Sequence, residues 1–238
     1  MRIDKFLADA NVASRSEIKK MLKQKRIKLA QQLVTDPKTQ VSSTSEVYVD
    51  DVLINYQKYY YYMLHKPSGV ISATFDRQAQ TVLDLIKPRD FVKDLAPVGR
   101  LDKDTTGLLL LTNDGQLAHR LLAPKKHVPK VYRALIAGRV DQTTQQLFAA
   151  GLTLKDQTQL KPAKLEILDV DEAKEESLIQ ITISEGKYHQ IKRMFGAVGM
   201  KVLTLHRLKM GTLTLDEQLK PGQYRPLTKA ELVSLQES

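Results

Sequence analysis

The sequence predicts an α+β protein with a mainly antiparallel mixed sheet in its larger domain. Stretches with strand-like composition alternate irregularly with single helices, and they lack the repeated strand–helix–strand spacing of a parallel sheet. The length of 238 residues fits one large domain or two unequal ones. A basic, helix-rich segment at the start of the chain is followed by a linker near residues 50–58. We therefore predict a small domain with its linker over residues 1–57 and a larger domain over residues 58–238.

The small domain is predicted to begin with two short helices. Ser14 and Glu17 form a capping box, in which each side chain satisfies a backbone N–H group at the start of the second helix. Apolar residues then recur at helical spacing and are expected to face a core. A small sheet should follow, with strands at 26–29 and 47–49 and a turn-rich segment between them.

The larger domain is predicted to mix strands with single helices. Strands are expected at 59–64, 108–111, 131–137, 165–170 and 178–184, with closing strands at 202–208 and 212–215. Helices are expected after a turn at 113–115, at 141–148 and at 188–198. Thr228 and Glu231 form a second capping box, which predicts a C-terminal helix.

Basic residues are unevenly distributed along the chain and indicate a polyanionic partner. The formal net charge is +10, and residues 1–29 hold nine Lys or Arg against three acidic residues. Residues 119–133 and 186–215 contain Lys and Arg but no Asp or Glu. This excess suits nucleic acid, an acidic membrane surface or phosphorylated metabolites. Four of the cations fall along one face of the second predicted helix: Arg15, Lys19, Lys23 and Arg26.

Composition disfavours several other classes of protein. The absence of cysteine rules out disulfides, thiol nucleophiles and cysteine-ligated metals, and it fits a reducing compartment. The histidines lack the spacing of a metal-binding helix, and no glycine-rich nucleotide cradle is present. No stretch approaches the ~20 apolar residues of a membrane helix, and the chain reaches Asp4 without an apolar stretch, unlike a secretory signal. We expect a cytoplasmic monomer without a cofactor, a metal, a disulfide partner or a membrane contact.

Residues 99–115 are the most informative stretch for chemistry. Arg100 and Asp102 lie two residues apart, between glycines and ahead of a predicted buried strand, so that their side chains share one face. A carboxylate beside cations stays ionised and can act as a nucleophile or a base. A simple turn with an Arg–Asp pair is the alternative. A magnesium site of Asp102, Asp104 and Asp114 is a poorer interpretation, because nearby cations compete for the carboxylates.

Two further segments carry residues that suit a site. Residues 185–195 end a strand and begin a helix with several cations, which favours phosphate binding; a solvated basic helix face is the alternative. Tyr132 lies at the start of a predicted strand. Such a tyrosine is either a core residue with a satisfied hydroxyl or part of a binding pocket.

Taken together, these segments resemble the RsuA branch of the pseudouridine synthases over essentially the whole chain. The first ~50 residues are similar to the alpha-L RNA-binding domain, of ribosomal-protein-S-four type, that precedes the catalytic domain in this family. The matching segments are 65–69, 99–115, 130–132, 183–195, 196–199 and 221–228. The resemblance implies a small alpha-L RNA-binding domain followed by a mainly antiparallel pseudouridine synthase catalytic domain.

The resemblance also implies site residues for the isomerisation of a uridine that is flipped out of its stack. Asp102 is expected to be the nucleophile, Lys192 the cation that keeps it ionised, and Tyr132 the residue that stacks on uracil and moves the C5 proton. Ile191 would form an apolar wall, and Arg100 would fill the gap in the RNA or hold the flipped phosphate. The remaining expected RNA-binding residues are Lys66, Arg15, Lys19, Lys23 and Arg26.

The segment Tyr188-His189-Gln190 resembles the small-subunit enzymes of the family. The implied target is therefore one uridine of 16S rRNA, within an assembling small ribosomal subunit. Two alternatives stay open: the same reaction on large-subunit (23S) rRNA, and a non-catalytic RNA-binding ribosome-assembly factor that uses the same basic surfaces.

The turn after the first strand of the small domain departs from the family pattern. The family usually has a glycine there, whereas residues 29–34 contain none. Because positive φ is costly for other residues, we expect this turn to adopt another shape.

Overall fold

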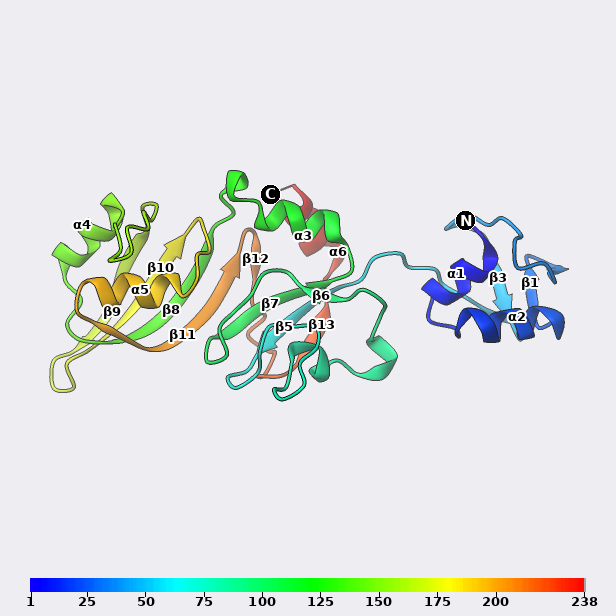
Figure 1. The fold of residues 1–238 in the computed structure, drawn as a ribbon, viewed down its shortest axis with the longest axis horizontal. Coiled ribbons are helices and arrows are strands. Elements are labelled where there is room, and N and C mark those ends of the chain that lie inside the picture. Colours follow the sequence, from blue (N-terminus) through cyan, green and yellow to red (C-terminus); the bar gives the residue numbers. More distant parts are fainter. Residues whose placement is uncertain (238) are drawn as a thin grey trace. The chain divides into compact units, whose positions relative to one another are not determined.

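The computed structural model describes residues 1–237 and divides the chain into two compact units (Figure 1). The small unit comprises Met1–Tyr60 and the short segment Phe91–Asp94, and the large unit comprises Tyr61–Asp90 and the chain from Leu95 onward. The boundary after Tyr60 lies close to the predicted one. None of the helices within residues 1–237 is long and apolar enough to cross a membrane.

The small unit packs two helices against a short antiparallel sheet. Its helices are α1 (Ile3–Asp9) and α2 (Arg15–Lys23). Its strands are β1 (Ile27–Leu29), β2 (Gln32–Leu33), β3 (Val47–Val49) and β4 (Val52–Leu53), in the order β2-β1-β3-β4. The predicted capping box is present: Glu17 N–H donates to Ser14 Oγ, and Ser14 N–H donates to the Glu17 carboxylate at 2.9 Å. Apolar side chains of both helices and of β1 and β3 form the core.

The turn between β1 and β2 corrects one expectation. Ala30 adopts a left-handed conformation with φ of +52°, so the backbone keeps positive φ without glycine. This conformation costs an alanine roughly 1–2 kcal/mol. Antiparallel pairing of Lys28 with Leu33, and a hydrogen bond from Ala30 N–H to Glu46 O at 2.7 Å, hold the turn. The prediction that positive φ would be avoided was therefore wrong.

The large unit is built on one long mixed sheet that is antiparallel except at one pair of strands. The strand order is β13-β5-β7-β11-β8-β10-β9, with β6 beside β7 and β12 beside β11. The strands are β5 (Tyr61–Lys66), β6 (Ala96–Pro97), β7 (Thr106–Thr112), β8 (Lys130–Ala137), β9 (Lys164–Asp171), β10 (Glu176–Ile183), β11 (Lys201–Met210), β12 (Leu213–Thr214) and β13 (Tyr224–Pro226). The mainly antiparallel arrangement confirms the predicted fold class.

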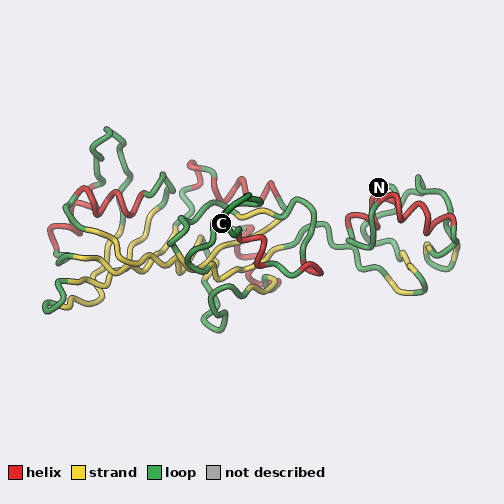
Figure 2. Tube along the Cα trace, turned by 60° about the horizontal axis from the view of Figure 1, so that its bottom comes forward, coloured by secondary structure: helices red, strands yellow, loops and turns green. Residues whose placement is uncertain are grey.

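In the part of the large unit that the structure describes, four α-helices accompany this sheet: α3 (Gly115–Leu122), α4 (Gln142–Ala150), α5 (Gln190–Ala197) and α6 (Lys229–Gln236). Short 3₁₀ turns occur at Val82–Leu85, Pro88–Asp90 and Pro124–Lys126. Helices α4 and α5 lie on the same side of the strands (Figure 2), and Phe148 packs edge-to-face on Phe195 at 5.0 Å between ring centroids. Asp141 and Thr228 cap α4 and α6, as their sequence signals predict.

The parallel pairing of β7 with β11 joins two halves of the large sheet. One half contains β13, β5 and β7, and the other contains β11, β8, β10 and β9. Only Thr106 with His206, and Gly107 with Arg207, are in register there. Gly107 has φ of +102°, and a Cβ at this position would lie 2.3 Å from the Arg207 carbonyl oxygen. The two halves meet this closely because residue 107 has no side chain.

Several predicted boundaries differ from the structure. The strand predicted at 202–208 is not a closing strand, because β11 lies in the middle of the sheet and pairs with both β7 and β8. The helix predicted from residue 188 begins at Gln190, because His189 has a left-handed backbone with φ of +47°. Strand β13 was not predicted; it ends in Pro226 and pairs only with β5, as suits an edge.

Candidate active site

Asp102 lies on the loop between β6 and β7, and buried polar groups hold this loop on two sides. On one side, Leu101 N–H donates to Ser72 Oγ at 3.1 Å, and the Ser72 hydroxyl donates to Leu101 O at 3.0 Å. On the other side, the Lys66 ammonium donates to Thr105 O at 2.9 Å and to Lys103 O at 3.2 Å. The backbone on both sides of Asp102 is thus fixed before any substrate arrives.

Lys66 does not contact solvent in this arrangement. The side chain is fully buried, and its third hydrogen bond goes to Pro67 O at 3.0 Å. Burial lowers the pKa of Lys66 to about 8, against the opposing effect of the Asp104 and Asp102 carboxylates. The structure does not support the expectation that Lys66 binds RNA, because all three donors of its ammonium are used by backbone carbonyls.

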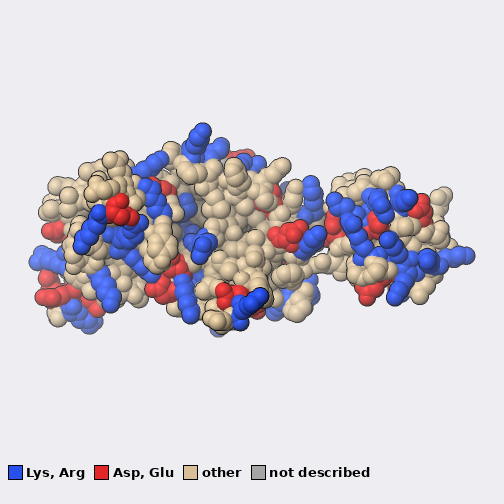
Figure 3. All heavy atoms as spheres, viewed as in Figure 1, with Lys and Arg blue, Asp and Glu red and all other residues tan. Residues whose placement is uncertain are grey.

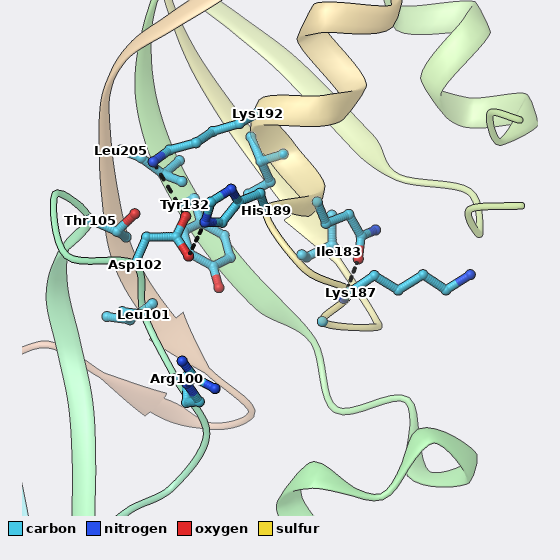
Figure 4. Close-up of a pocket in the computed structure, with 13 residues that line it drawn as sticks. Arg100, Leu101, Asp102, Thr105, Tyr132, Ile183, Lys187, His189, Lys192 and Leu205 are labelled. Carbon is cyan, nitrogen blue, oxygen red and sulfur yellow. Dashed lines mark hydrogen bonds and ion pairs between the residues drawn. The ribbon is translucent and has the colours of Figure 1, made fainter. Parts of the chain in front are cut away.

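The Asp102 carboxylate faces two groups from the start of α5 (Figure 4). Lys192 Nζ lies 3.3 Å from one carboxylate oxygen, and His189 Nε2 lies 3.4 Å from the other. The Asp102 side chain is 28% exposed, so the pocket is open enough to admit a substrate. The cation that the resemblance assigned to Asp102 is therefore next to it.

Lys192 is shared between two carboxylates. Its ammonium donates to both Asp104 oxygens, at 2.6 and 2.8 Å, which is closer than its contact with Asp102. Partial burial acts to lower the pKa of Lys192, but its hydrogen bond to Asp104 and the charges of both carboxylates raise it overall. The Lys192 hydrogen bond in turn lowers the pKa of Asp104. Lys192 is thus held in its charged form beside Asp102.

Apolar side chains line part of the pocket around Asp102. Tyr132 from β8 is 7% exposed and Ile191 from α5 is 4% exposed, and both line the pocket together with Leu205 from β11. Arg100 is exposed, and among the residues labelled in Figure 4 it lies at the end opposite to Lys192. The other lining residues are Leu101, Thr105, Ile183, Gly186, Lys187, His189, Gln190 and Lys192. Arg100, Asp102, Tyr132, Ile191 and Lys192, all predicted, are thus brought to one pocket.

The expected RNA-binding cations of residues 15–26 belong to the small unit and not to this pocket. Arg15 and Lys19 are exposed and line a hollow with Arg2 and Lys5. Lys23 is exposed at the end of α2. Arg26 differs from them, because it follows α2 and its guanidinium makes a two-pronged contact with the Asp50 carboxylate. The expectation that Arg26 continues the helical row was wrong.

Metal binding by the acidic residues of 99–115 finds no support. Asp114 caps α3 by accepting the N–H groups of Gln116 and Leu117, and it also accepts the Tyr61 hydroxyl at 2.9 Å. Within residues 1–237, no group of three or more His, Asp or Glu residues is placed to hold a metal ion.

Three features of the site were missed by reasoning from the sequence. His189 touches Asp102, Asp104 shares Lys192, and Lys66 holds the loop from below. Asp104 carried a usable signal, because it lies two residues from Asp102, as Arg100 does. His189 and Lys66 carried no such signal in the sequence. The contact of His189 depends on its left-handed backbone, and the role of Lys66 depends on its complete burial.

The geometry defines the class of protein. A carboxylate beside a lysine lies in a pocket that is partly lined by apolar side chains, and Lys and Arg side chains are spread over the surface of each unit (Figure 3). Within residues 1–237, Thr105 Oγ1 is one of two buried side-chain atoms without a partner, and Thr105 lines this pocket. These features fit an enzyme that uses carboxylate chemistry on an anionic polymer.

Comparison with known proteins gives the family. Residues 60–197 match the RNA pseudouridylate synthase family, and residues 1–47 match the S4 domain. The chain is 45% identical, over its full length and 99% of the relative, to YtzG, an uncharacterized RNA pseudouridine synthase of Bacillus subtilis. It is 40% identical, over 99% of both chains, to ribosomal small subunit pseudouridine synthase A of Haemophilus influenzae.

A solved structure shows the same relationship. The crystal structure of a pseudouridylate synthase covers 99% of this chain and 99% of its own, with 40% identity and a TM-score of 0.68. This chain therefore belongs to the RNA pseudouridylate synthase family. It is a pseudouridine synthase of the RsuA type, with an S4 domain ahead of the catalytic domain.

Proposed function

We propose that this enzyme converts one uridine of small-subunit (16S) rRNA to pseudouridine, with Asp102 as the nucleophile. The observation that carries the proposal is the position of the Asp102 carboxylate, between Lys192 and His189 in a pocket walled by Tyr132 and Ile191. Full-length relatives named as ribosomal small subunit pseudouridine synthases support the choice of RNA.

The reaction is an isomerisation and needs no redox partner. The bond between uracil N1 and ribose C1′ breaks, and a bond from C5 to C1′ forms. The proton on C5 is lost, and N1 gains one, so atoms and charge balance. Asp102 forms the covalent intermediate that allows the base to rotate, by attack on either the ribose or the uracil ring. Lys192 places a positive charge beside the Asp102 carboxylate, and Asp104 holds Lys192 in place.

Tyr132, Ile191 and Leu205 hold the uracil. Their apolar surfaces exclude water from the base, and the Tyr132 ring stacks on it. The Tyr132 hydroxyl moves the C5 proton as a general acid and base. A carboxylate inside a pocket cannot reach the atoms of a nucleotide that is stacked in a helix, so the uridine enters flipped out of the RNA.

Base flipping costs a few kcal/mol, which contacts with the RNA must offset. Arg100, exposed at the pocket, fills the gap left by the base or holds its phosphate. The S4 domain adds a second grip through Arg15, Lys19 and Lys23. Two grips on one chain raise the effective concentration of the correct RNA segment, which favours one site within an assembling small subunit over isolated uridines.

The test compares the wild-type enzyme with Asp102→Asn. Tritium release from 5-tritiated uridine in rRNA measures turnover, and filter binding of the same RNA measures affinity. Asp102→Asn should abolish tritium release while binding stays within about threefold, because the amide is isosteric but cannot act as the nucleophile. Turnover at near wild-type rate by Asp102→Asn would refute the mechanism.

The choice of RNA has a separate test. Chemical mapping of pseudouridines in both rRNAs, from cells with and without the gene, identifies the modified position. Loss of one 16S pseudouridine supports the proposal, whereas loss of a 23S pseudouridine assigns the reaction to the large subunit. A purified wild-type protein that binds rRNA but leaves every uridine unchanged would be an assembly factor.

A further inference from the structure

An exposed aromatic pair lies at the mouth of the pocket. The Tyr188 and His189 rings stack face to face, with centroids 3.8 Å apart and an angle of 19° between their planes. His189 also contacts the Asp102 carboxylate through Nε2 at 3.4 Å. Tyr188 is 75% exposed, although a tyrosine usually buries much of its ring. The mechanism above gives no role to either ring.

The segment that carries the pair is fixed by its own hydrogen bonds. Gln190, which is 4% exposed, accepts Lys187 N–H at 3.0 Å and donates to the Glu185 carboxylate at 2.8 Å. His189 adopts a left-handed backbone with φ of +47°, which is uncommon for a residue other than glycine. Strained residues of this kind persist where the surrounding structure imposes them, and they cluster at functional sites. The stack is thus presented rigidly towards solvent.

The two faces of the stack differ in what they can bind. One face of the Tyr188 ring is covered by His189, which in turn is held at Asp102. Tyr188 is nevertheless 75% exposed, so most of its surface away from His189 is open to solvent. A flat, exposed ring with a rigid backing is a surface on which an unpaired base stacks, whatever its sequence.

We propose that the Tyr188–His189 pair is a stacking platform for an unpaired rRNA base next to the target uridine. This inference rests on the proposed function and adds a substrate-binding contact to it. Tyr188 is absent from the residues that line the pocket around Asp102, so its ring acts on binding and not on the chemical step. His189 contacts both Tyr188 and Asp102, and it thereby holds the platform at a fixed place beside the carboxylate.

The test measures kcat and KM for tritium release from rRNA with three full-length variants. Tyr188→Leu removes the ring, Tyr188→Phe keeps it, and Leu168→Ala changes another exposed apolar residue, on β9 and away from the pocket. Tyr188→Leu should raise KM by roughly 5- to 100-fold, the range that base–aromatic stacking supports, with kcat changed by less than about threefold. Tyr188→Phe should recover most of the loss, and Leu168→Ala should match the wild type.

A binding experiment provides a second readout. Short rRNA fragments carry 2-aminopurine on one side or the other of the mapped uridine, and the protein carries Asp102→Asn to prevent turnover. Stacking should quench the fluorescence at one of these positions, and the added change Tyr188→Leu should remove the quenching. Melting temperature checks that each variant is folded.

The outcomes separate the two proposals. An unchanged KM for Tyr188→Leu, a fall in kcat alone, or equal defects in Tyr188→Leu and Tyr188→Phe would each overturn the platform. Wild-type protein that forms no pseudouridine would instead overturn the proposed function.

Discussion

Two lysines contact the Asp102 loop, and they do so in opposite ways. Lys66, fully buried below the loop, donates only to backbone carbonyls. Lys192, partly exposed on α5, contacts the carboxylates of Asp102 and Asp104. Burial lowers the pKa of Lys66 to about 8, whereas two carboxylates raise that of Lys192 in spite of its own burial. A lysine side chain thus anchors the backbone of the loop in one environment, and it places a positive charge beside the loop's carboxylate in the other.

After Asp102→Asn, the largest effect is expected at Lys192. Lys192→Met removes the cation beside Asp102 and should lower kcat roughly 100-fold, because charge stabilisation in a partly buried site is lost. Melting temperature should change little, because the side chain lies at the surface of the pocket. Asp104→Asn is the matched control: it removes the tighter partner of Lys192 but leaves Asp102 with its cation, so its defect should be clearly smaller. A near-normal kcat for Lys192→Met would remove the basis for pairing it with Asp102.

The next effect is expected at Lys66 and should appear first in stability. Lys66→Met keeps the length of the side chain but leaves the Pro67, Lys103 and Thr105 carbonyls without their donor. Unsatisfied buried groups cost about 1–3 kcal/mol, so urea denaturation should show a loss of that order. Turnover should fall as well, because the loop that carries Asp102 loses its anchor. Unchanged stability would show that solvent reaches these carbonyls.

An effect on stability of similar size is expected from pH. The Lys66 pKa is about 8 in the folded chain and close to its ordinary 10.5 when unfolded. Below pH 8 both states hold the proton, and the folded state bears the full cost of the buried charge. Between pH 8 and 10.5 the folded state releases its proton first, so stability relative to Lys66→Met should rise with pH. One pKa unit corresponds to about 1.4 kcal/mol, so the gain from pH 7 to 10 should be on the order of 1–3 kcal/mol by denaturation. A constant difference between the two chains would contradict the lowered pKa.

The smallest effect is expected in the small unit. Its exposed cations on α2 differ from Arg26, which is paired with Asp50. Arg15→Gln, Lys19→Gln and Lys23→Gln together should weaken rRNA binding and reduce the slope of log affinity against log salt by roughly 2–3, because fewer counterions are released. Arg26→Gln is the control, since Arg26 is engaged by Asp50, and it should reduce the slope by less than 1. Equal slopes for the triple variant and the wild type would exclude α2 from the RNA contact.

Local signals in the sequence predicted much of the fold. Capping boxes at Ser14 and Thr228 and the cap at Asp141 placed three helix starts, because caps depend on residues a few positions apart. The hairpin of β9 and β10 followed from its strand-like composition. Antiparallel character followed from the irregular order of elements. Resemblance to a family, and not spacing alone, brought Asp102, Tyr132 and Lys192 into one site.

What the sequence did not reveal depends on contacts between distant segments. From the sequence, Lys66 is expected to be a surface cation, but in the fold its ammonium donates to backbone carbonyls of the loop from 101 to 105. Ala30 takes a conformation that its own preference opposes, because the pairing of β1 with β2 imposes it. From the sequence, Arg26 is expected to end a row of cations on the helix, but its guanidinium donates to the carboxylate of Asp50, 24 residues away. In each case a tertiary contact outweighs the local preference.

The close approach at Gly107 joins the two parts of the sheet that carry the residues of the proposed active site. Asp102 enters from the half of the sheet that contains β7, whereas Tyr132 and Lys192 come from the half that contains β8 and β11, and two residue pairs join these halves. Any side chain at residue 107 would act as a wedge at this joint and widen the distance across which the carboxylate meets its cation. A glycine outside the pocket thus helps to set the separation between the carboxylate and the lysine that the proposed mechanism requires.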